Sequence, residues 1–250
     1  MVLIRPETYT PDAVILCSGD FPTHPTPLSL LHQAERVVCC DSAAFGFVRQ
    51  GGIPWRIVGD CDSILSPRNS EERSILDKYR HLVIHETEQD SNDLTKSVRF
   101  CQSQGIRRLA IIGATGKRED HTLGNISLTI EYMRMGIETR IYTDYGVFIP
   151  CRGDITCEVF IPDGFRLESD ADARRTKSTQ VSIFNISAKH FKPEGLRYPF
   201  DRLGNWWEGT LNEAITSPFS IHADGEYLLY INYNEHILKT QLKTYILCEK

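Results

Sequence analysis

Residues 56–64 read R-I-V-G-D-C-D-S-I, and this stretch sets a pattern that recurs along the chain. A short apolar run breaks at Gly59, and two carboxylates, Asp60 and Asp62, follow two residues apart. In an extended or turning backbone, residues i and i+2 point the same way, so both side chains are expected to face one site. Such a pair suits Mg²⁺, which binds through one or two carboxylates plus substrate phosphates. The same letters also fit a simple Asp-rich turn, because Gly, Asp and Ser are turn formers.

The segments around this stretch alternate between apolar runs and helical patterns. We predict strands at 13–17, 37–40, 56–58, 81–84, 108–112 and 138–142. We predict helices at 29–35, 43–50, 69–78, 94–104 and 123–135, with a proline-marked loop at 22–27. The strands are too apolar to have a face in water, which favours a parallel sheet covered by helices on both sides.

Polar clusters follow the carboxyl ends of these strands. Asp41 follows the second, Asp60 and Asp62 the third, and the runs 89–93 and 113–121 the fourth and fifth. In open α/β sheets ligands bind at that edge. Segments far apart in the sequence are therefore expected to meet in one binding site.

The pattern changes after about residue 145. Helical periodicity gives way to short strands, which we predict at 147–149, 156–161, 181–185, 219–222, 227–233 and 244–247. The charged stretch 169–179 is predicted to be an exposed loop. Short strands at this spacing suggest a small sandwich or barrel. We predict an α/β class protein with an α/β domain at 1–145 and an all-β sandwich at 146–250.

Composition limits the class of protein. The chain has 250 residues, 41% hydrophobic and 24% charged, which is ordinary for a globular protein. Its net charge of −5 argues against a nucleic-acid partner. It shows no signal peptide and no membrane-spanning run, so no membrane partner is expected. The eight cysteines form no C-x-x-C pair, which predicts reduced, mostly buried thiols, no zinc site and a cytoplasmic location.

The expected site is rich in like charges. Its carboxylates would repel one another unless a cation such as Mg²⁺ offset them; they are Asp41, Asp60, Asp62, Asp90 and Asp93. The loop from Gly113 to Gly116 precedes a helix, so its amides suit a phosphate, although it is not a Walker loop. Arg118 adds a cation for phosphate oxygens, while His121 fits either phosphate binding or a structural role in the loop.

Three blocks in this order resemble the signature blocks of thiamine pyrophosphokinase: V-G-D-C-D-S-I at 58–64, E-Q-D-S-N-D-L-T-K at 88–96 and G-A-T-G-K-R-E-D-H-T-L-G-N-I at 113–126. In the C-terminal half, E-G-L-R-Y-P-F at 194–200 and G-T-L-N-E at 209–213 are similar to two further blocks. The resemblance implies an α/β nucleotide-binding domain, a β-sandwich and a homodimer with a composite active site. It also implies transfer of pyrophosphate from ATP to thiamine, giving thiamine diphosphate and AMP.

The resemblance also implies roles for single residues. Mg²⁺ would be bound by Asp60, Asp62 and Asp93, with Asp41 and Asp90 close by. The ATP region would comprise Gly113, Arg118, Asp120, His121 and Asn125, and thiamine would contact Gln89, Thr210 and Asn212. An aromatic surface at Trp206 or Trp207 suits the cationic thiazolium.

The chain departs from the family pattern at four places. Residues 116–118 read G-K-R where the loop usually has G-G-R, and Asn92 stands where a threonine is common. Residues 41–45 read D-S-A-A-F where D-G-G-A-N is usual, and Leu211 replaces a serine. Three alternative functions stay open: a pyrophosphokinase for another small alcohol, a Mg²⁺-dependent nucleotide phosphohydrolase, and a non-catalytic nucleotide or thiamine sensor. We predict that Asp62→Asn nearly abolishes turnover.

Overall fold

The computed structural model describes residues 1–161 and 178–233. The chain divides into two compact units, one of Thr10–Asp144 and one that joins Met1–Tyr9 to the residues from Tyr145 onward. We predicted that the first nine residues are part of the α/β domain, but they belong to the β-rich unit. The reason is that β1 (Val2–Ile4) pairs in parallel with β9 (Ile155–Cys157).

The α/β unit is built on a parallel sheet. Its strands are β2 (Ala13–Leu16), β3 (Val37–Cys40), β4 (Arg56–Gly59), β5 (Val83–His85), β6 (Arg108–Ile112) and β7 (Glu138–Tyr142). They lie in the order β7-β6-β2-β3-β4-β5, and every neighbouring pair is parallel. The predicted parallel sheet is confirmed. The strand order reverses between β2 and β6, so the crevice outside these two strands is the expected ligand position.

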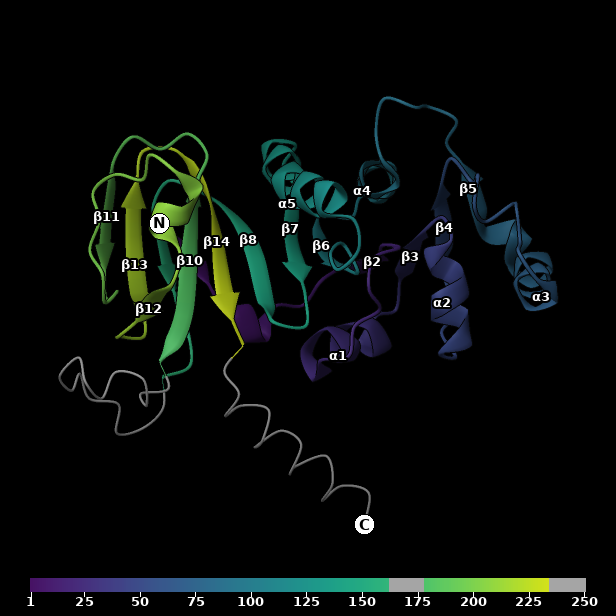
Figure 1. Cartoon of the computed structure of the whole chain (residues 1–250), viewed down its shortest axis with the longest axis horizontal. Coiled ribbons are helices and arrows are strands. Elements are labelled where there is room, and N and C mark those ends of the chain that lie inside the picture. Colours follow the sequence, from purple (N-terminus) through teal and green to yellow (C-terminus); the bar gives the residue numbers. More distant parts are fainter. Residues whose placement is uncertain (162–177, 234–250) are drawn as a thin grey trace, which may run out of the picture. The chain divides into compact units, whose positions relative to one another are not determined.

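Helices cover both faces of this sheet. They are α1 (Pro25–Gln33), α2 (Ala43–Arg49), α3 (Ser70–Tyr79), α4 (Asp93–Ser103) and α5 (Glu119–Arg134), with the short 3₁₀ turn η2 (Arg80–Leu82) after α3. Helices α4 and α5 lie on one face, and α1 and α2 lie on the other (Figure 1).

Two helix starts differ from the prediction. The predicted proline loop was wrong at Pro25 and Pro27, which lie in the first turn of α1. A proline is tolerated there because the first turn has no partner for its backbone N–H. Helix α5 begins at Glu119, earlier than expected, with acidic Glu119 and Asp120 in its first turn. Acidic side chains are favoured at that end by the helix dipole.

The β-rich unit contains two sheets. One has the order β1-β9-β13-β11, with β13 (Phe219–Ala223) and β11 (Phe191–Glu194); the other joins β12 (Asn212–Ala214), β10 (Thr179–Asn185), β14 (Glu226–Asn232) and β8 (Gly146–Arg152) in antiparallel pairs. Phe191 and Tyr227 connect the sheets, with ring centroids 5.6 Å apart. Between them lie apolar side chains such as those of Ile155, Ile183 and Phe219.

Three strands of this unit were not predicted: β1, β11 and β12. Strand β11 contains Pro193, which is tolerated because β11 lies at the edge of its sheet. Strands β1 and β12 are too short to show a period. The predicted strand at 244–247 and nearly all of the predicted loop at 169–179 lie outside the described residues. Two further 3₁₀ turns are η1 (Pro6–Thr8) and η3 (Trp206–Gly209).

The described cysteines are free and buried, as predicted: Cys17, Cys39, Cys40, Cys61, Cys101, Cys151 and Cys157. Among the helices of residues 1–161 and 178–233, none has the length and apolar character needed to cross a membrane.

Candidate active site

A pocket of about 410 Å³ lies in the α/β unit at the point where the strand order reverses. Its walls come from the segments after β2, β4 and β6, from the last residue of β3, and from the N-terminal parts of α4 and α5. The pocket includes six of the predicted site residues: Asp60, Asp93, Gly113, Arg118, His121 and Asn125. Its position agrees with the rule that ligands bind outside the carboxyl ends of strands at such a point.

Two loops meet backbone to backbone on one side of the pocket. The amide of Gly19 donates to the carbonyl of Gly113 at 2.7 Å, and the amide of Asp20 donates to that of Thr115 at 3.0 Å. A Cβ on Gly19 would lie 2.3 Å from both carbonyl oxygens, which is impossible without displacing a loop. Gly113 has φ +68, a conformation that glycine adopts without strain. The glycines therefore fix the glycine-rich loop (residues 113–116) against the end of β2.

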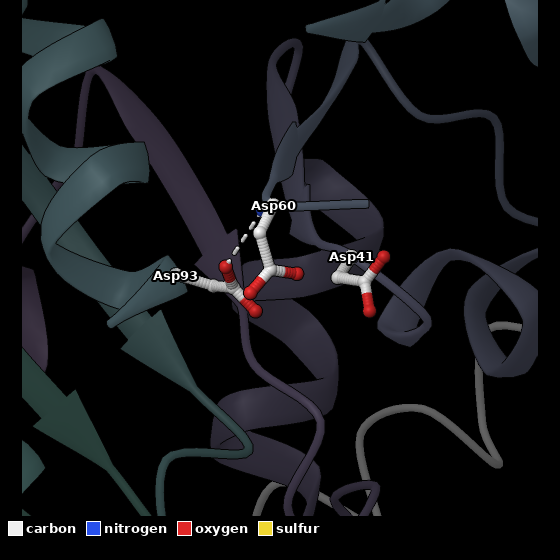
Figure 2. Close-up of side chains that lie close together, drawn as sticks. All are labelled: Asp41, Asp60 and Asp93. Atoms are coloured by element: carbon white, nitrogen blue, oxygen red, sulfur yellow. Dashed lines mark hydrogen bonds between the residues drawn. The ribbon is translucent and has the colours of Figure 1, made fainter. Parts of the chain in front are cut away.

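Three carboxylates lie close together (Figure 2), and two of them, Asp60 and Asp93, line the other side of the pocket. Oxygen atoms of Asp41, Asp60 and Asp93, here called the aspartate cluster, all lie within 4.8 Å of one another. The backbone amide of Asp60 donates to Oδ1 of Asp93 at 3.2 Å. The three residues come from the ends of β3 and β4 and from the start of α4, far apart in sequence. Such a set of hard oxygen donors fits Mg²⁺ or a similar cation.

Gly59 makes this approach possible. A Cβ at Gly59 would lie 2.8 Å from Oδ1 of Asp93 and 3.1 Å from Cβ of Asp41. Real Cβ atoms do not approach an oxygen this closely, so any side chain at this position would force the cluster apart. The glycine in the opening motif thus serves to bring the carboxylates together.

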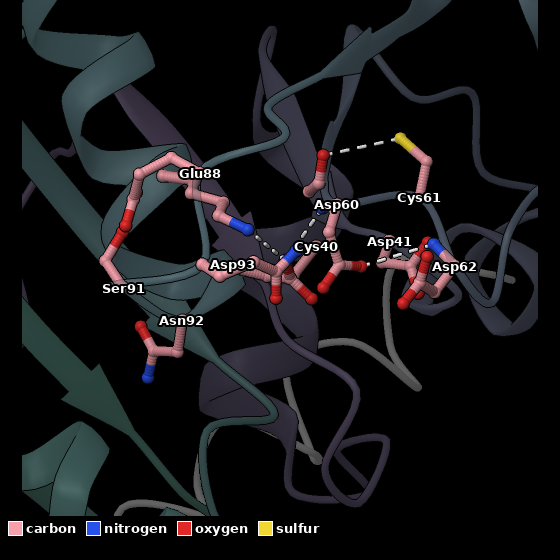
Figure 3. A network of polar contacts seen from close by, with 12 residues as sticks. Cys40, Asp41, Asp60, Cys61, Asp62, Glu88, Ser91, Asn92 and Asp93 are labelled. Atoms are coloured by element: carbon pink, nitrogen blue, oxygen red, sulfur yellow. Dashed lines mark hydrogen bonds and ion pairs between the residues drawn. The ribbon is translucent and has the colours of Figure 1, made fainter.

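Asp41 also organises the turn that follows β4. Its Oδ1 accepts from the amide of Ile64 at 2.9 Å, and its Oδ2 accepts from that of Ser63 at 3.3 Å. Asp41 is buried and has φ 43, a left-handed conformation that Asp tolerates better than most residues. Asp62 lies on the same turn and is exposed, with its amide donating to Oδ1 of Asp60 at 3.2 Å (Figure 3). Its own carboxylate does not belong to the aspartate cluster.

Burial and mutual repulsion change the ionisation of this end of the pocket. Burial raises the pKa of Asp93, and the charges of Asp60 and Asp41 raise it further, while the ammonium of Lys96 acts in the opposite direction. Burial, together with nearby aspartates, also raises the pKa of the Cys61 thiol to about 12. The site therefore favours a bound cation and does not favour a thiolate.

The opposite end of the pocket is exposed and cationic. Lys117 donates to the carbonyl of Ser18 at 2.6 Å. Arg118 forms a two-point ion pair with Asp120, at 3.1 and 2.6 Å, which holds the pKa of Asp120 at about 2. Asp120 also accepts from the amide of His121 at 2.9 Å.

Asn125 connects the two ends. Its amide group donates to the carbonyl of Ala114 at 2.9 Å, and its Oδ1 accepts from Asn92 at 3.0 Å. Asn92 in turn caps α4 by accepting from the amide of Thr95 at 2.9 Å. These hydrogen bonds hold the glycine-rich loop and the helix that carries Asp93 in fixed positions relative to each other. Gln89 and Asp90 are exposed and do not line this pocket.

The remaining predicted residues lie in the β-rich unit. The side chain of Asn212 forms two hydrogen bonds with the backbone of Tyr198. Its Oδ1 accepts from the amide of Tyr198 at 3.1 Å, and its Nδ2 donates to the carbonyl at 2.7 Å, so this side chain fixes the segment around Tyr198. The hydroxyl of Thr210 donates to the carbonyl of Trp207 at 2.7 Å. Leu211 has φ 59 and is 74% exposed, and Trp207 is 72% exposed. An apolar surface is therefore available beside the predicted thiamine block.

Sequence reasoning missed several pocket residues, of which Ser18, Gly19, Asn92 and Lys117 are examples. Residues 18–20 follow the first predicted strand, so the rule that found the other clusters could also have found this segment. Asn92 belongs to the 89–93 run and caps α4. Its contact with Asn125 joins segments far apart in the sequence, so the local pattern did not indicate it.

Fold and site together define an α/β protein whose pocket, at the carboxyl edge of a parallel sheet, joins clustered carboxylates to a glycine-rich loop. Comparison with known sequences makes this more specific. The model of the thiamin pyrophosphokinase catalytic domain matches residues 28–141, and the model of the thiamin pyrophosphokinase substrate-binding domain matches residues 166–230. Most of the chain is thus covered, and it belongs to the thiamin pyrophosphokinase family, as its motifs predicted.

Relatives agree with this assignment. Thiamine pyrophosphokinase of Bacillus subtilis is 28% identical over 180 residues, covering 71% of this chain and 77% of the relative. The crystal structure of a thiamine pyrophosphokinase from B. subtilis has a TM-score of 0.68 at 21% identity, covering 89% of this chain and 98% of that one. Thiamin pyrophosphokinase from Candida albicans has a TM-score of 0.71 at 17% identity and covers 92% of each chain. The two structural matches show the same mixed α/β fold.

Proposed function

We propose that this chain transfers the terminal pyrophosphoryl group of ATP to the hydroxyl oxygen of thiamine, in a Mg²⁺-dependent reaction that yields thiamine diphosphate and AMP. Family membership supports the reaction. The observation that carries the chemistry is the meeting, in one pocket, of the glycine-rich loop with Asp60 and Asp93 of the aspartate cluster. Phosphoryl-type transfer depends on positioning and charge neutralisation, and this pocket supplies both kinds of group.

Asp60 and Asp93 are the central metal ligands of this proposal, and Asp62 is the third. Both oxygens of Asp41 already accept amide hydrogens from the turn at 63–64, so its main role is to hold that turn. Asp62 lies on this turn with a solvent-exposed side chain, available to a metal or to metal-bound water. Mg²⁺ bound here would neutralise phosphate charge and orient the phosphate oxygens.

The glycine-rich loop and the cations after it are assigned to the phosphates of ATP. The loop precedes the N-terminus of α5, where backbone amides and the helix dipole favour an anion. Arg118 is exposed, so it can exchange its carboxylate partner for phosphate oxygens without conformational change in the core. His121 and Asn125 line the same region, with Asp120 paired to Arg118.

Thiamine is assigned to Gln89 and to the segment from Thr210 to Asn212, and the protein is proposed to act as a homodimer in the cytoplasm. These assignments rest on the family resemblance. The exposed rings of Trp206 and Trp207 are suitable surfaces for a cationic thiazolium.

The test is AMP release from Mg-ATP by the purified protein, with and without thiamine. Thiamine-dependent AMP, matched by thiamine diphosphate, is the expected result. AMP formed without thiamine would instead indicate a phosphohydrolase or another alcohol acceptor. Binding without any AMP would indicate a sensor.

The metal ligands are tested by Asp62→Asn and Asp41→Asn, with Asp90→Asn as the exposed control. Loss of a metal ligand should lower kcat by about a hundredfold or more, so Asp62→Asn should be nearly inactive and normally folded. Asp41→Asn should mainly lower the melting temperature, because it weakens the turn. Near-normal turnover of Asp62→Asn, combined with lost Mg²⁺ binding in Asp41→Asn, would show that the metal is bound by the aspartate cluster itself.

A further inference from the structure

Lys96 is a buried cation next to the aspartate cluster. It lies on α4 and is only 4% exposed. Lysine is rarely buried to this extent without an anionic partner, because removing the ammonium from water is costly. The buried ammonium of Lys96 must therefore be stabilised by negative charge nearby.

The ammonium of Lys96 lies 3.9 Å from Oδ1 of Asp93. This distance is too long for a hydrogen bond, so the contact is electrostatic. The same Oδ1 accepts from the backbone amide of Asp60 at 3.2 Å. Asp93 is thus held between the amide of one cluster residue and the ammonium of Lys96.

Helix geometry explains why these two residues act together. Asp93 is the first residue of α4 and Lys96 follows three positions later, so both side chains lie on the same side of the helix. The pocket walls include Asp93 but not Lys96. Lys96 can therefore influence a bound metal through Asp93 and through its field, without direct contact.

The charges around Asp93 indicate what Lys96 does. The aspartate cluster brings three carboxylates together, and Lys96 places one ammonium beside Asp93. Without Lys96 this ammonium would be lost, so repulsion among the carboxylates would increase when no cation is bound.

We propose that Lys96 is a positioning residue that orients Asp93 and reduces the negative charge around the aspartate cluster, so that a divalent cation binds and exchanges readily. This inference rests on the proposed metal site. Removing Lys96 should strengthen metal binding while weakening catalysis. A purely structural ion pair would weaken both.

The experiment compares Lys96→Met with Lys96→Arg and Lys96→Gln, and uses Lys78→Met on α3 as an exposed lysine control. The dissociation constant of Mg²⁺, or of Mn²⁺ as a spectroscopic probe, is measured by calorimetry on the protein without nucleotide. Melting temperature is measured in EDTA and again with Mg²⁺. Lys96→Met is similar to lysine in shape, so packing is largely kept.

Lys96→Met should bind the divalent cation about tenfold more tightly than the unmodified protein, because a nearby positive charge is gone. Its melting temperature should fall in EDTA and recover with Mg²⁺, and its kcat should fall. Lys96→Arg should restore the dissociation constant. Lys96→Gln, which keeps a polar group without charge, should behave like Lys96→Met and provides the test if the methionine variant does not fold.

The outcomes separate this inference from the proposed function. Equal or weaker metal binding in Lys96→Met and Lys96→Gln, with normal binding in the unmodified protein, would overturn the role of Lys96 alone. If the unmodified protein binds no divalent cation, the metal site itself is wrong and the role of Lys96 fails with it.

Discussion

The two ends of the pocket are built differently. At the end that carries the aspartate cluster, here called the metal end because we propose that it binds Mg²⁺, Asp41 is buried and Asp93 is half-buried, and each is held by backbone amides or a neighbouring charge. At the opposite end, here called the phosphate end because we propose that it binds the phosphates of ATP, Lys117 and Arg118 are exposed, and each is held by one partner at the surface. One end is therefore preorganised, and the other can rearrange around a ligand.

This difference fits the demands of phosphoryl transfer. A metal needs its oxygen ligands at fixed positions before it binds, whereas a triphosphate brings many oxygens that can be met in several ways. We therefore expect substitutions at the metal end to lower kcat strongly. Substitutions at the phosphate end should mainly raise the KM for ATP.

The largest effect is expected for Gly59→Ala. The added Cβ would lie 2.8 Å from Oδ1 of Asp93, so the aspartate cluster must open. We expect kcat to fall by about a hundredfold or more and stability to fall by about 1–3 kcal/mol from overpacking. Steady-state kinetics and urea denaturation measure the two quantities.

Gly124→Ala is the matched control, since a Cβ at this helical position meets nothing within 4 Å. It should keep its activity and gain about 0.5–1 kcal/mol of stability. If Gly59→Ala is as active as this control, the metal end is not preorganised and the comparison between the two ends fails.

An intermediate effect is expected for Arg118→Ala at the phosphate end. Loss of one exposed cation should raise the KM for ATP by about tenfold and change kcat much less, since a charge-assisted hydrogen bond is worth about 1.5–3 kcal/mol. Arg107→Ala, just before the amino end of β6, is the control and should leave the KM unchanged. A large fall in kcat with unchanged KM would mean that Arg118 acts in the transition state and is as constrained as the metal end.

Sequence alone predicted much of the pocket lining, but Asp62, expected to face the same site as Asp60, lies outside the aspartate cluster. The apolar strands and the residues after them predicted the parallel sheet, and Asp41, Asp60 and Asp93 do meet. The roles of Gly59 and Lys96 depend on distances between segments far apart in sequence, and spacing cannot supply these. The start of α5 was missed because Asp120 and His121 look like loop residues until the helix dipole is considered.

The β-rich unit was predicted less well for a related reason. Its strands are short, and β11 contains a proline that ordinarily argues against a strand. β11 forms a strand because it pairs with β13, and this pairing is an interaction between segments distant in the sequence. The amide of Asn212, predicted to contact thiamine, is occupied by the backbone of Tyr198, which no motif could reveal.

The smallest effect is expected for Asp120→Asn, which removes the ion pair that holds Arg118. Its hydrogen bonds with Arg118 hold the pKa of Asp120 at about 2 in the folded protein, well below the value of about 3.9 expected when unfolded. The pair therefore stabilises the fold above about pH 4, and this contribution is lost as the pH falls toward 2. Melting curves of Asp120→Asn should differ slightly from those of the unmodified protein at pH 5–8 and converge with them at acid pH. Because Arg118 is then free for phosphate, the KM for ATP should fall by about twofold; a raised KM would show that the ion pair itself shapes the phosphate end, and that this end is also preorganised.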